Sequence, residues 1–257
     1  MKQELIKPIV RVGNSAGVLL PREWLNGRAR IELVEKPLNI NQDVLEILSP
    51  YLEDVIGVYL VGSYARGEQT KDSDVDVVVI TKNTKKELVS GKYHISISTL
   101  EGIRKTIKSY PELVLPRLSE AVTILNPEII EELKKIEVTK KSFKNFIEDS
   151  ERIIQINKEF IDLDKLDGKI LESKSVVYSL ILRLRGVLLI KCLLNNKKYS
   201  KKIFEKWILR TINKEDFRKI YEIYKIERDK KKSSINIEIA PIEKLLALLI
   251  KEIKLLK

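Results

Sequence analysis

Two apolar runs separated by a polar connection form the most informative pattern in the chain. The runs at 55–60 and 75–80 predict two β-strands, and Gly62 follows the first of them. A ten-residue polar connection leads to the second run, which opens with two aspartates one residue apart, Asp74 and Asp76. Side chains at i and i+2 of a strand point to the same face, so we expect the two carboxylates to share one face.

The turn after the first strand and the aspartate pair together suggest a site for metal and phosphate. Two carboxylates at one spot repel each other unless a cation lies between them, and such a pair with open coordination positions suits Mg²⁺ and its phosphates. Gly62 and Ser63 follow a strand, where free backbone N–H groups can bind phosphate. The hairpin from Gly62 to Asp76 therefore carries the components of a metal–triphosphate site.

The segments around this hairpin predict an α/β unit. Alternation at 93–98 predicts a third strand, and the apolar positions 44, 45, 48, 52 and 55 have helical spacing. Thr99 is placed as the N-cap of a following helix. The other expected elements are a short helix at 85–89, a helix end at 113–118, a short strand at 120–126 and a helix at 127–137.

The first 36 residues predict a small β unit. Segments at 6–12, 16–20 and 30–35 predict strands, and Pro21 opens a single helical turn at 21–25. A unit of this size is too small to bury its own faces well. We therefore expect it to dimerise or to pack on the rest of the chain.

From residue 138 onward the pattern predicts helices and no convincing strand. The expected helices are 143–160, 175–194, 203–212, 217–226 and 242–256. The predicted fold class is α+β. We expect a β-hairpin unit at 1–36, an α/β core with a short mixed sheet at 37–138 and a helical bundle at 139–257.

Composition places the chain among intracellular proteins. Hydrophobic residues make up 44% of the 257 residues, enough for a real core. The one cysteine, Cys192, excludes an internal disulfide and fits a reducing compartment. No uncharged apolar run is long enough to span a membrane, and no N-terminal apolar segment precedes a cleavage site. We expect a cytoplasmic protein with no membrane partner.

The net charge of +11 is unevenly distributed. Residues 1–138 carry 19 Lys+Arg and 20 Asp+Glu, a net of −1, and residues 139–257 carry 29 and 17, a net of +12. A basic helical segment suggests an anionic partner such as RNA, DNA or a nucleotide. The alternative is a surface rich in Lys and Glu of the kind found in thermophiles.

Gly62-Ser63, ten further residues and then Asp74-x-Asp76, with Arg66 in between, resemble the minimal nucleotidyltransferase domains of the DNA polymerase β superfamily. The resemblance implies that Asp74 and Asp76 bind Mg²⁺. It implies that Gly62 and Ser63 hold the β- and γ-phosphates and that Arg66 neutralises phosphate charge. The implied reaction transfers a nucleoside monophosphate from an NTP to an acceptor and releases pyrophosphate.

At the position of the third catalytic group, the sequence departs from the pattern of this family. Its members usually carry a third carboxylate on a neighbouring strand, but the segment 93–98 contains no acid. His94 or Ser96 occupies the expected place, and of the two His94 offers a neutral imidazole that can accept the proton of a nucleophile. The alternative is a strand-edge histidine satisfied by hydrogen bonds. Glu101 and Glu120 are fallback acids without a spacing argument, so turnover is less firmly indicated than nucleotide binding.

The charged residues of the polar connection have structural alternatives. Arg66 could pair with Asp72 or Asp74 and only shape the loop. Lys71 is expected to be a solvated loop residue, and Asp72 is expected to cap the turn rather than to bind metal.

Two arginines interrupt the most apolar helix. Arg183 and Arg185 lie two residues apart, so they diverge by roughly 200° around the helix and cannot both face solvent. A buried arginine requires an acidic partner. One hypothesis directs Arg183 toward the nucleotide. The alternative is an ion pair with an interior acid such as Asp162 or Glu172.

Near the N-terminus, the segments 12–15, 18–21 and 23–25 resemble the swapped-hairpin domains of the AbrB/SpoVT type. The resemblance implies an intertwined homodimer, often one that binds DNA. The residues that would touch nucleic acid are Arg11, Arg22, Arg28 and Arg30.

Two functional hypotheses follow from the sequence. The first is a Mg²⁺-dependent nucleotidyltransferase that uses an NTP and an unidentified RNA, protein or small-molecule acceptor. The second is a nucleic-acid-binding regulator in which the transferase fold is inactive or senses nucleotide. The Gly-Ser turn and the Asp pair favour the first hypothesis, and the absent third acid favours the second.

Overall fold

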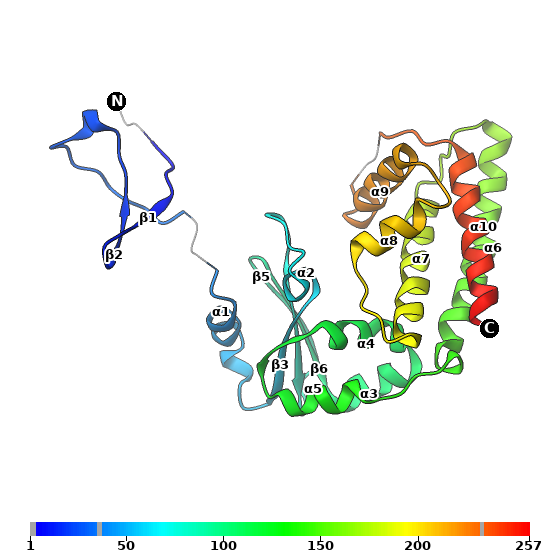
Figure 1. The fold of residues 1–257 in the computed structure, drawn as a ribbon, viewed down its shortest axis with the longest axis horizontal. Coiled ribbons are helices and arrows are strands. Elements are labelled where there is room, and N and C mark those ends of the chain that lie inside the picture. The colour runs from blue at the N-terminus through cyan, green and yellow to red at the C-terminus, as the bar shows by residue number, and fades with distance from the viewer. Residues whose placement is uncertain (1–3, 35–37, 232–233) are drawn as a thin grey trace. The chain divides into compact units, whose positions relative to one another are not determined.

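The computed structural model describes residues 4–34, 38–231 and 234–257. Contacts divide the chain after residue 39 into two units, which we describe separately (Figure 1). The further division at residue 138, between the α/β core and the helical bundle, stays a prediction.

The N-terminal unit is built on one antiparallel hairpin. Strands β1 (Ile9–Val12) and β2 (Ser15–Val18) are joined by a turn at Gly13, whose φ of 60° favours glycine. The helical turn η1 (Arg22–Trp24) follows Pro21, as predicted. The predicted strand at 30–35 is wrong over 30–34, which form no strand, and Glu35 lies outside the described residues. Alternation alone does not make a strand where no neighbouring strand pairs with it.

The second unit contains a five-stranded mixed sheet with strand order β5-β6-β4-β3-β7. The predicted strands at 55–60, 75–80 and 93–98 are confirmed in place. Strand β4 lies between β3, which is antiparallel to it, and β6, which is parallel to it. The strands are β3 (Val55–Val61), β4 (Val75–Thr81), β5 (Lys86–Ser90), β6 (Tyr93–Thr99) and β7 (Val122–Leu125).

The predicted short helix at 85–89 is wrong, because this segment is the edge strand β5. Leu88 pairs with Ile95 of β6, and Ser90 pairs with Tyr93 across a two-residue turn. Gly91 in that turn has a φ of 56°, a conformation that two-residue hairpin turns require. Gly91, which marks the hairpin turn, lies just after the segment 85–89. Five residues alone do not distinguish helical spacing from strand alternation, so the segment without its turn was predicted as a helix.

Helices cover both faces of the sheet because β4 alternates its side chains between two cores. One face carries Val75, Val77 and Val79 and packs against α1. The other carries Val78 and Ile80 and packs against α3, α4 and α5. The elements are α1 (Ile40–Ile47), η2 (Ser49–Tyr51), α2 (Gly62–Arg66), α3 (Leu100–Ser109), α4 (Pro111–Glu120) and α5 (Pro127–Lys134).

Thr99 caps α3 as predicted, since its side chain accepts a hydrogen bond from the Gly102 backbone N–H at 3.0 Å.

The remaining chain forms a helical bundle beside α4 (Figure 1). The predicted helices are confirmed, and among the described residues after 138 the only β feature is an isolated bridge between Ile170 and Glu238. Helix α7 lies in the core of the bundle and packs against α6, α9 and α10. The helices are η3 (Lys140–Phe143), α6 (Lys144–Asp167), α7 (Ser175–Leu194), α8 (Lys201–Ile208), α9 (Lys214–Arg228) and α10 (Ile239–Leu256).

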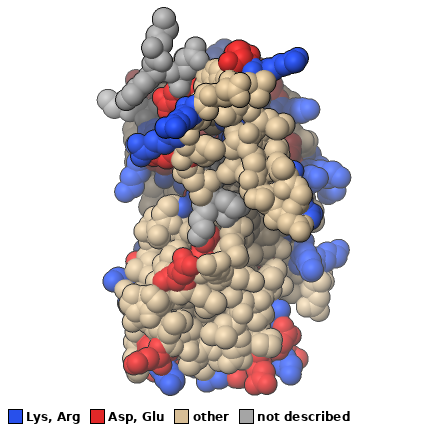
Figure 2. All heavy atoms as spheres, turned by 90° about the vertical axis from the view of Figure 1, so that its left-hand side faces the viewer, with Lys and Arg blue, Asp and Glu red and all other residues tan. Residues whose placement is uncertain are grey.

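One face of the molecule carries both basic and acidic side chains. On the face shown in Figure 2, basic side chains of the described residues stand in separate groups among acidic and uncharged ones. In the part of the chain that the structure describes, no helix has the length and apolar character to cross a membrane.

Candidate active site

The turn after β3 brings the backbone against a carboxylate. Gly62 has a φ of 74°, and a Cβ atom at this position would collide with the carboxylate of Asp76. Gly62 begins the short helix α2, which ends at Gly67 with a φ of 67°. Only glycine meets both requirements of position 62, so the backbone N–H of Gly62 and the Asp76 side chain are held close together.

The two aspartates and the histidine gather at one end of the sheet. Asp76 pairs with Val61 on β3 and with His94 on β6, so the three strands place these residues in one row. Asp74 precedes β4, and its Oδ1 lies 4.0 Å from His94 Nε2. Asp76 is half-buried, whereas Asp74 and His94 are exposed. The structure therefore brings together the three residues that the sequence proposed as catalytic.

The electrostatics of Asp76 suit a nearby cation. Burial raises the pKa of its carboxyl group, and the negative charge of Asp74 adds to this rise. The positive charges of Arg117 and Arg66 and the neighbouring His94 act in the opposite direction without cancelling it. A cation between Asp74 and Asp76 would offset the repulsion and the cost of burial together.

The two aspartates have the chemistry of a Mg²⁺ site. Within the described residues neither carboxylate accepts a hydrogen bond, and the nearest basic group to the pair is His94 Nε2, 4.0 Å from Asp74 Oδ1. No group of three or more His, Cys, Asp or Glu side chains in the described ranges could hold a metal. Two carboxylates with open positions for water and phosphate are the arrangement that Mg²⁺ prefers at nucleotide sites. The residues present fit this ion.

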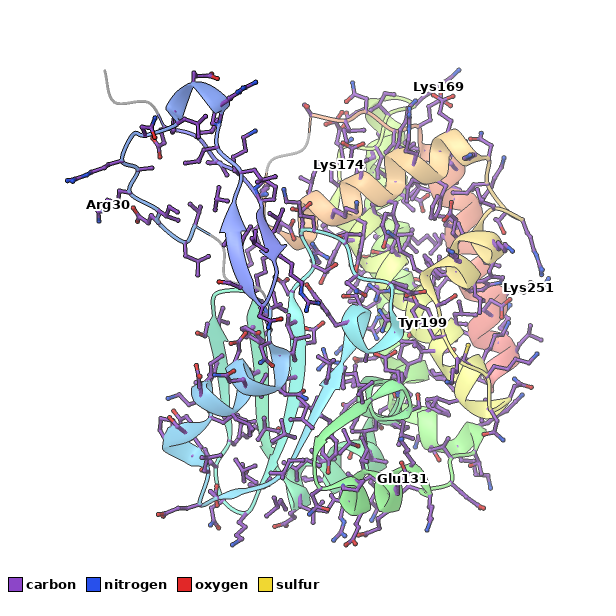
Figure 3. The ribbon with its side chains drawn as sticks, turned by 60° about the vertical axis from the view of Figure 1, so that its left-hand side comes forward. Arg30, Glu131, Lys169, Lys174, Tyr199 and Lys251 are labelled. Atoms are coloured by element: carbon purple, nitrogen blue, oxygen red, sulfur yellow. The ribbon has the colours of Figure 1, made fainter. Side chains whose placement is uncertain are left out.

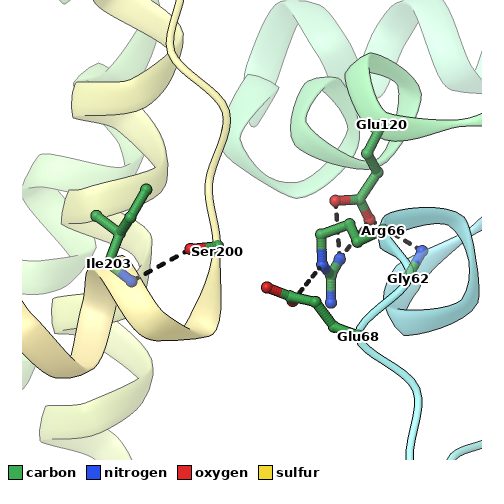
Figure 4. A network of polar contacts seen from close by, with 6 residues as sticks. All are labelled: Gly62, Arg66, Glu68, Glu120, Ser200 and Ile203. Atoms are coloured by element: carbon green, nitrogen blue, oxygen red, sulfur yellow. Dashed lines mark hydrogen bonds and ion pairs between the residues drawn. The ribbon is translucent and has the colours of Figure 1, made fainter.

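Arg66 is held by two glutamates (Figure 4). Its Nη1 donates to both carboxylate oxygens of Glu120, at 2.7 and 2.8 Å, and its Nε donates to Glu68 Oε2 at 3.0 Å. Burial opposes the charge of Arg66, but these hydrogen bonds outweigh it and raise the pKa of the guanidinium. Arg66 thus pairs with carboxylates, as the alternative to phosphate binding predicted. Its partners are Glu68 and Glu120, however, and not Asp72 or Asp74.

Glu120 also accepts a hydrogen bond from the backbone of the turn. Its Oε1 accepts a hydrogen bond from the Gly62 N–H at 2.9 Å (Figure 4). One carboxylate at the end of α4 therefore binds both groups that the sequence assigned to phosphate, the Gly62 amide and the Arg66 guanidinium. Its side chain is 15% exposed.

The bundle contributes to the same pocket. A small pocket of about 40 Å³ is lined by Arg66 and Glu120 on one side and by the α7–α8 connection on the other. Figure 3 labels Tyr199 where this connection approaches α2. The lining residues from the connection are Lys197, Lys198 and Tyr199.

Tyr199 links the pocket to the interior of the bundle. Burial raises the pKa of its hydroxyl, while Arg185 and Arg66 act against that rise. Arg185 hydrogen-bonds Tyr199 and also donates from Nη1 to the hydroxyl of Tyr224 at 2.6 Å. The bundle therefore presents cationic and hydroxyl groups to the pocket that Arg66 and Glu120 line.

Arg183 is directed elsewhere. Its Nη2 lies 3.6 Å from Asp149 Oδ2 of α6, and its guanidinium lies 5.6 Å from the centre of the Phe146 ring. The structure thus places Arg183 against α6 and not against the Gly62–Asp76 hairpin. An ion pair of Arg183 is observed, but its acid is Asp149, whose side chain is 39% exposed, rather than the interior acid, Asp162 or Glu172, that the sequence suggested.

Sequence reasoning missed several residues that the tertiary structure brings to the site. Arg117 contributes to the electrostatics of Asp76, and Tyr199 lines the pocket beside Arg66. Both come from segments whose own patterns are those of ordinary amphipathic helices and turns. Glu120 was considered only as a fallback acid, because no local spacing relates it to Gly62.

Comparisons with known proteins show which family the chain resembles. A family model described as a nucleotidyltransferase domain matches residues 41–163. Two Methanocaldococcus jannaschii proteins, each named as a candidate protein adenylyltransferase, are 36% identical to the chain. One match covers 138 residues, 51% of this chain and 93% of the relative. The other covers 90 residues, 31% of this chain and 87% of the relative.

Solved structures with a similar arrangement include a spectinomycin adenyltransferase, AAD(9), from Enterococcus faecialis with ATP and spectinomycin. It has a TM-score of 0.48 and 15% identity, and the match covers 83% of this chain and 97% of that one. A nucleotidyltransferase-like protein from Exiguobacterium sibiricum has a TM-score of 0.37 and 15% identity, over 84% of this chain and 75% of that one. The family model begins after the first 36 residues, so their likeness to AbrB-type hairpins stays a prediction.

Proposed function

Because the chain belongs to the nucleotidyltransferase family, we propose that it transfers AMP from ATP to a hydroxyl group on a protein, with Mg²⁺ as cofactor and pyrophosphate as the second product. The choice of ATP and of a protein acceptor is supported by the names of the two archaeal relatives. The observation that carries the proposal is the row formed by Asp74, Asp76 and His94 beside the Gly62 turn.

In this proposal, different residues bind the metal and the phosphates. Asp74 and Asp76 would hold Mg²⁺, which supplies charge neutralisation for the triphosphate when it is bound. The amides of Gly62 and Ser63, at the start of α2, are the proposed donors to the phosphates, and Arg66 is the proposed positive charge beside them. Positioning and electrostatics of this kind provide most of the rate enhancement in phosphoryl and nucleotidyl transfer.

His94 is the proposed proton acceptor. The acceptor hydroxyl oxygen forms a bond to the α-phosphorus, and the bond from that phosphorus to the β-phosphate bridging oxygen breaks. The hydroxyl proton passes to His94, which lies in register with Asp76 and is open to solvent, and pyrophosphate leaves. His94 therefore takes the place of the usual third carboxylate.

The transferase proposal is tested with ATP labelled in the α-phosphate. The protein is incubated with Mg²⁺, labelled ATP, and separate protein and RNA fractions, and label transfer and pyrophosphate release are measured. We expect label on protein, and we expect the Asp74→Asn/Asp76→Asn double variant to lose at least about a hundredfold of the rate. No label on any fraction, with wild-type protein folded, contradicts the proposal, and label confined to RNA contradicts the choice of acceptor.

We also propose that the N-terminal unit forms a homodimer. No side chain in the described part of this unit, residues 4–34, is buried. Large apolar side chains stand open to solvent on it, and Ile6, Leu19 and Leu25 are 78%, 70% and 70% exposed. So many exposed apolar side chains on so small a unit favour a protein–protein interface. A second copy of the hairpin carries the same apolar side chains and is therefore the proposed partner. DNA binding by such a dimer is the remaining alternative.

A further inference from the structure

Glu120 occupies the place that the proposed function assigns to a phosphate group. Its carboxylate accepts hydrogen bonds from the Gly62 N–H and from Arg66 Nη1, which are the amide and the guanidinium expected to bind the triphosphate. A carboxylate and a phosphate oxygen use such donors in the same way. Both cannot occupy these donors at once.

The contact does not follow from sequence neighbours. Glu120 ends α4, which packs on β3 and α2 and also on α7 of the bundle. Within the described residues, Arg66 has one other carboxylate partner, Glu68, which bonds Nε and makes no contact with Gly62. Glu68 can therefore stay in place when a phosphate arrives, whereas Glu120 must leave.

The pocket offers Glu120 a second set of partners. Lys197 and Lys198 line the same pocket from the α7–α8 connection, together with Tyr199. In the described part of the chain, neither lysine forms an ion pair within 4.0 Å. A carboxylate released from Arg66 therefore finds two ammonium groups across the pocket.

We propose that, without nucleotide, the Glu120 carboxylate occupies the position at Gly62 and Arg66 where a phosphate of ATP binds. ATP displaces this carboxylate, which then moves to Lys197 and Lys198. This inference rests on the proposed function, because it takes ATP as the ligand of the Gly62 turn. Glu120 thereby lowers the affinity for nucleotide and couples nucleotide binding to the α7–α8 connection, the part of the bundle that faces the site.

The test compares ATP affinity in the full-length protein by calorimetry, with Mg²⁺ present, in wild type and in two matched variants. Glu120→Gln removes the competing charge from both donors, and we expect ATP to bind about tenfold more tightly. Glu68→Gln removes a charge from the same guanidinium but leaves the Gly62 amide occupied, and we expect an affinity change of less than about threefold.

A second readout separates displacement from a simple structural role. Without nucleotide, Glu120→Gln loses hydrogen bonds and should melt at a lower temperature than wild type, yet bind ATP more tightly. A purely structural carboxylate would lower both the melting temperature and the affinity. Lys197→Ala/Lys198→Ala should weaken ATP binding in wild type but have a smaller effect in the Glu120→Gln background, where no released carboxylate needs a partner.

Each outcome decides between the two proposals. If wild type binds ATP and Glu120→Gln binds it equally or more weakly, the displacement inference fails while the proposed function stands. If neither wild type nor Glu120→Gln binds ATP, the proposed function fails and takes the inference with it. Tighter binding in Glu120→Gln, with little change in Glu68→Gln, supports the inference.

Discussion

At the scale of residues, the proposed catalytic end of the sheet depends on a glycine and a histidine. Gly62 has a left-handed φ and leaves no room for a Cβ beside Asp76, so one close approach builds both the turn proposed to bind phosphate and the carboxylate proposed to bind metal. His94 lies one strand away in register with Asp76. Strand pairing therefore brings the proposed nucleotide-binding residues next to the proposed proton acceptor.

Replacing the histidine tests its proposed chemical role. His94→Gln keeps a polar side chain of similar size on an exposed strand position and should not unfold the protein. We expect kcat to fall by roughly a hundredfold or more, with the Kd for ATP nearly unchanged, since the imidazole acts on the acceptor proton. Steady-state labelling and calorimetry measure the two quantities. An unchanged kcat would show that solvent or another group takes the proton.

A buried glutamate limits stability at neutral pH. Glu112 in α4 is 6% exposed, and its Oε2 has no hydrogen-bond partner among the described residues. Burial raises the pKa of this carboxyl group, although Arg183 acts against the rise. The folded state thus binds the proton more tightly than the unfolded state, and stability falls as pH rises through the pKa of the folded state.

Glu112→Gln should remove this penalty. We expect the variant to be more stable than wild type by about 1 kcal/mol near pH 7, with the difference disappearing below the unfolded pKa, where Glu112 is protonated in both states. Urea unfolding at several pH values measures it. A variant less stable than wild type at pH 7 would show that the ionised form is stabilised by Arg183 instead.

At the scale of elements, α4 and α7 determine how the bundle meets the sheet. Helix α4 packs on the sheet and on α7, and its last residue, Glu120, reaches the Gly62 turn. The close fit of α7 against α6 depends on Gly186, where a Cβ would collide with the ring of Phe146. Arg183 lies over the same ring and reaches Asp149.

Gly186→Ala should disturb this helix pair. The ring of Phe146 must move to admit the methyl group, which we expect to cost about 1–3 kcal/mol of unfolding free energy. Denaturant unfolding followed by circular dichroism measures the change. The control is Ala247→Gly in α10, which reports the ordinary cost of a glycine in a helix. Gly168→Ala is unsuitable as a control, because the positive φ of Gly168 would add backbone strain. No loss in Gly186→Ala would mean that the helices separate without penalty.

At the scale of the whole molecule, the N-terminal unit and the transferase unit differ in how they are stabilised. The second unit has three buried apolar clusters of its own. The hairpin unit contributes no buried side chain in its described part. A unit of this kind gains most of its stability from a partner.

The homodimer proposal predicts the effect of charge on the hairpin. Ile9→Lys/Val12→Lys in the full-length chain places two charges on exposed apolar positions of β1. We expect the variant to become monomeric in light scattering, while ATP binding remains within about twofold of wild type. Arg22→Ala, on the same unit but outside the hairpin, is the control and should stay dimeric. A monomeric wild-type protein would contradict the proposal directly.

The sequence by itself determined the strand–turn–strand core and the residues that define it. The apolar runs, Gly62, the aspartate pair and the helical segments after 138 are local patterns, and local backbone preference and side-chain periodicity are enough to specify them. The edge strand β5 was mistaken for a helix because five residues carry too little periodicity to separate the two structures.

Only the tertiary structure decided which charges meet. Glu120 reaches Gly62 and Arg66, Arg183 turns to Asp149, and Tyr199 joins the pocket from the bundle. These contacts join residues far apart in the chain, and their geometry depends on how α4 and α7 pack rather than on any spacing in the sequence. Electrostatic partners are chosen by distance in space, which a one-dimensional pattern does not contain.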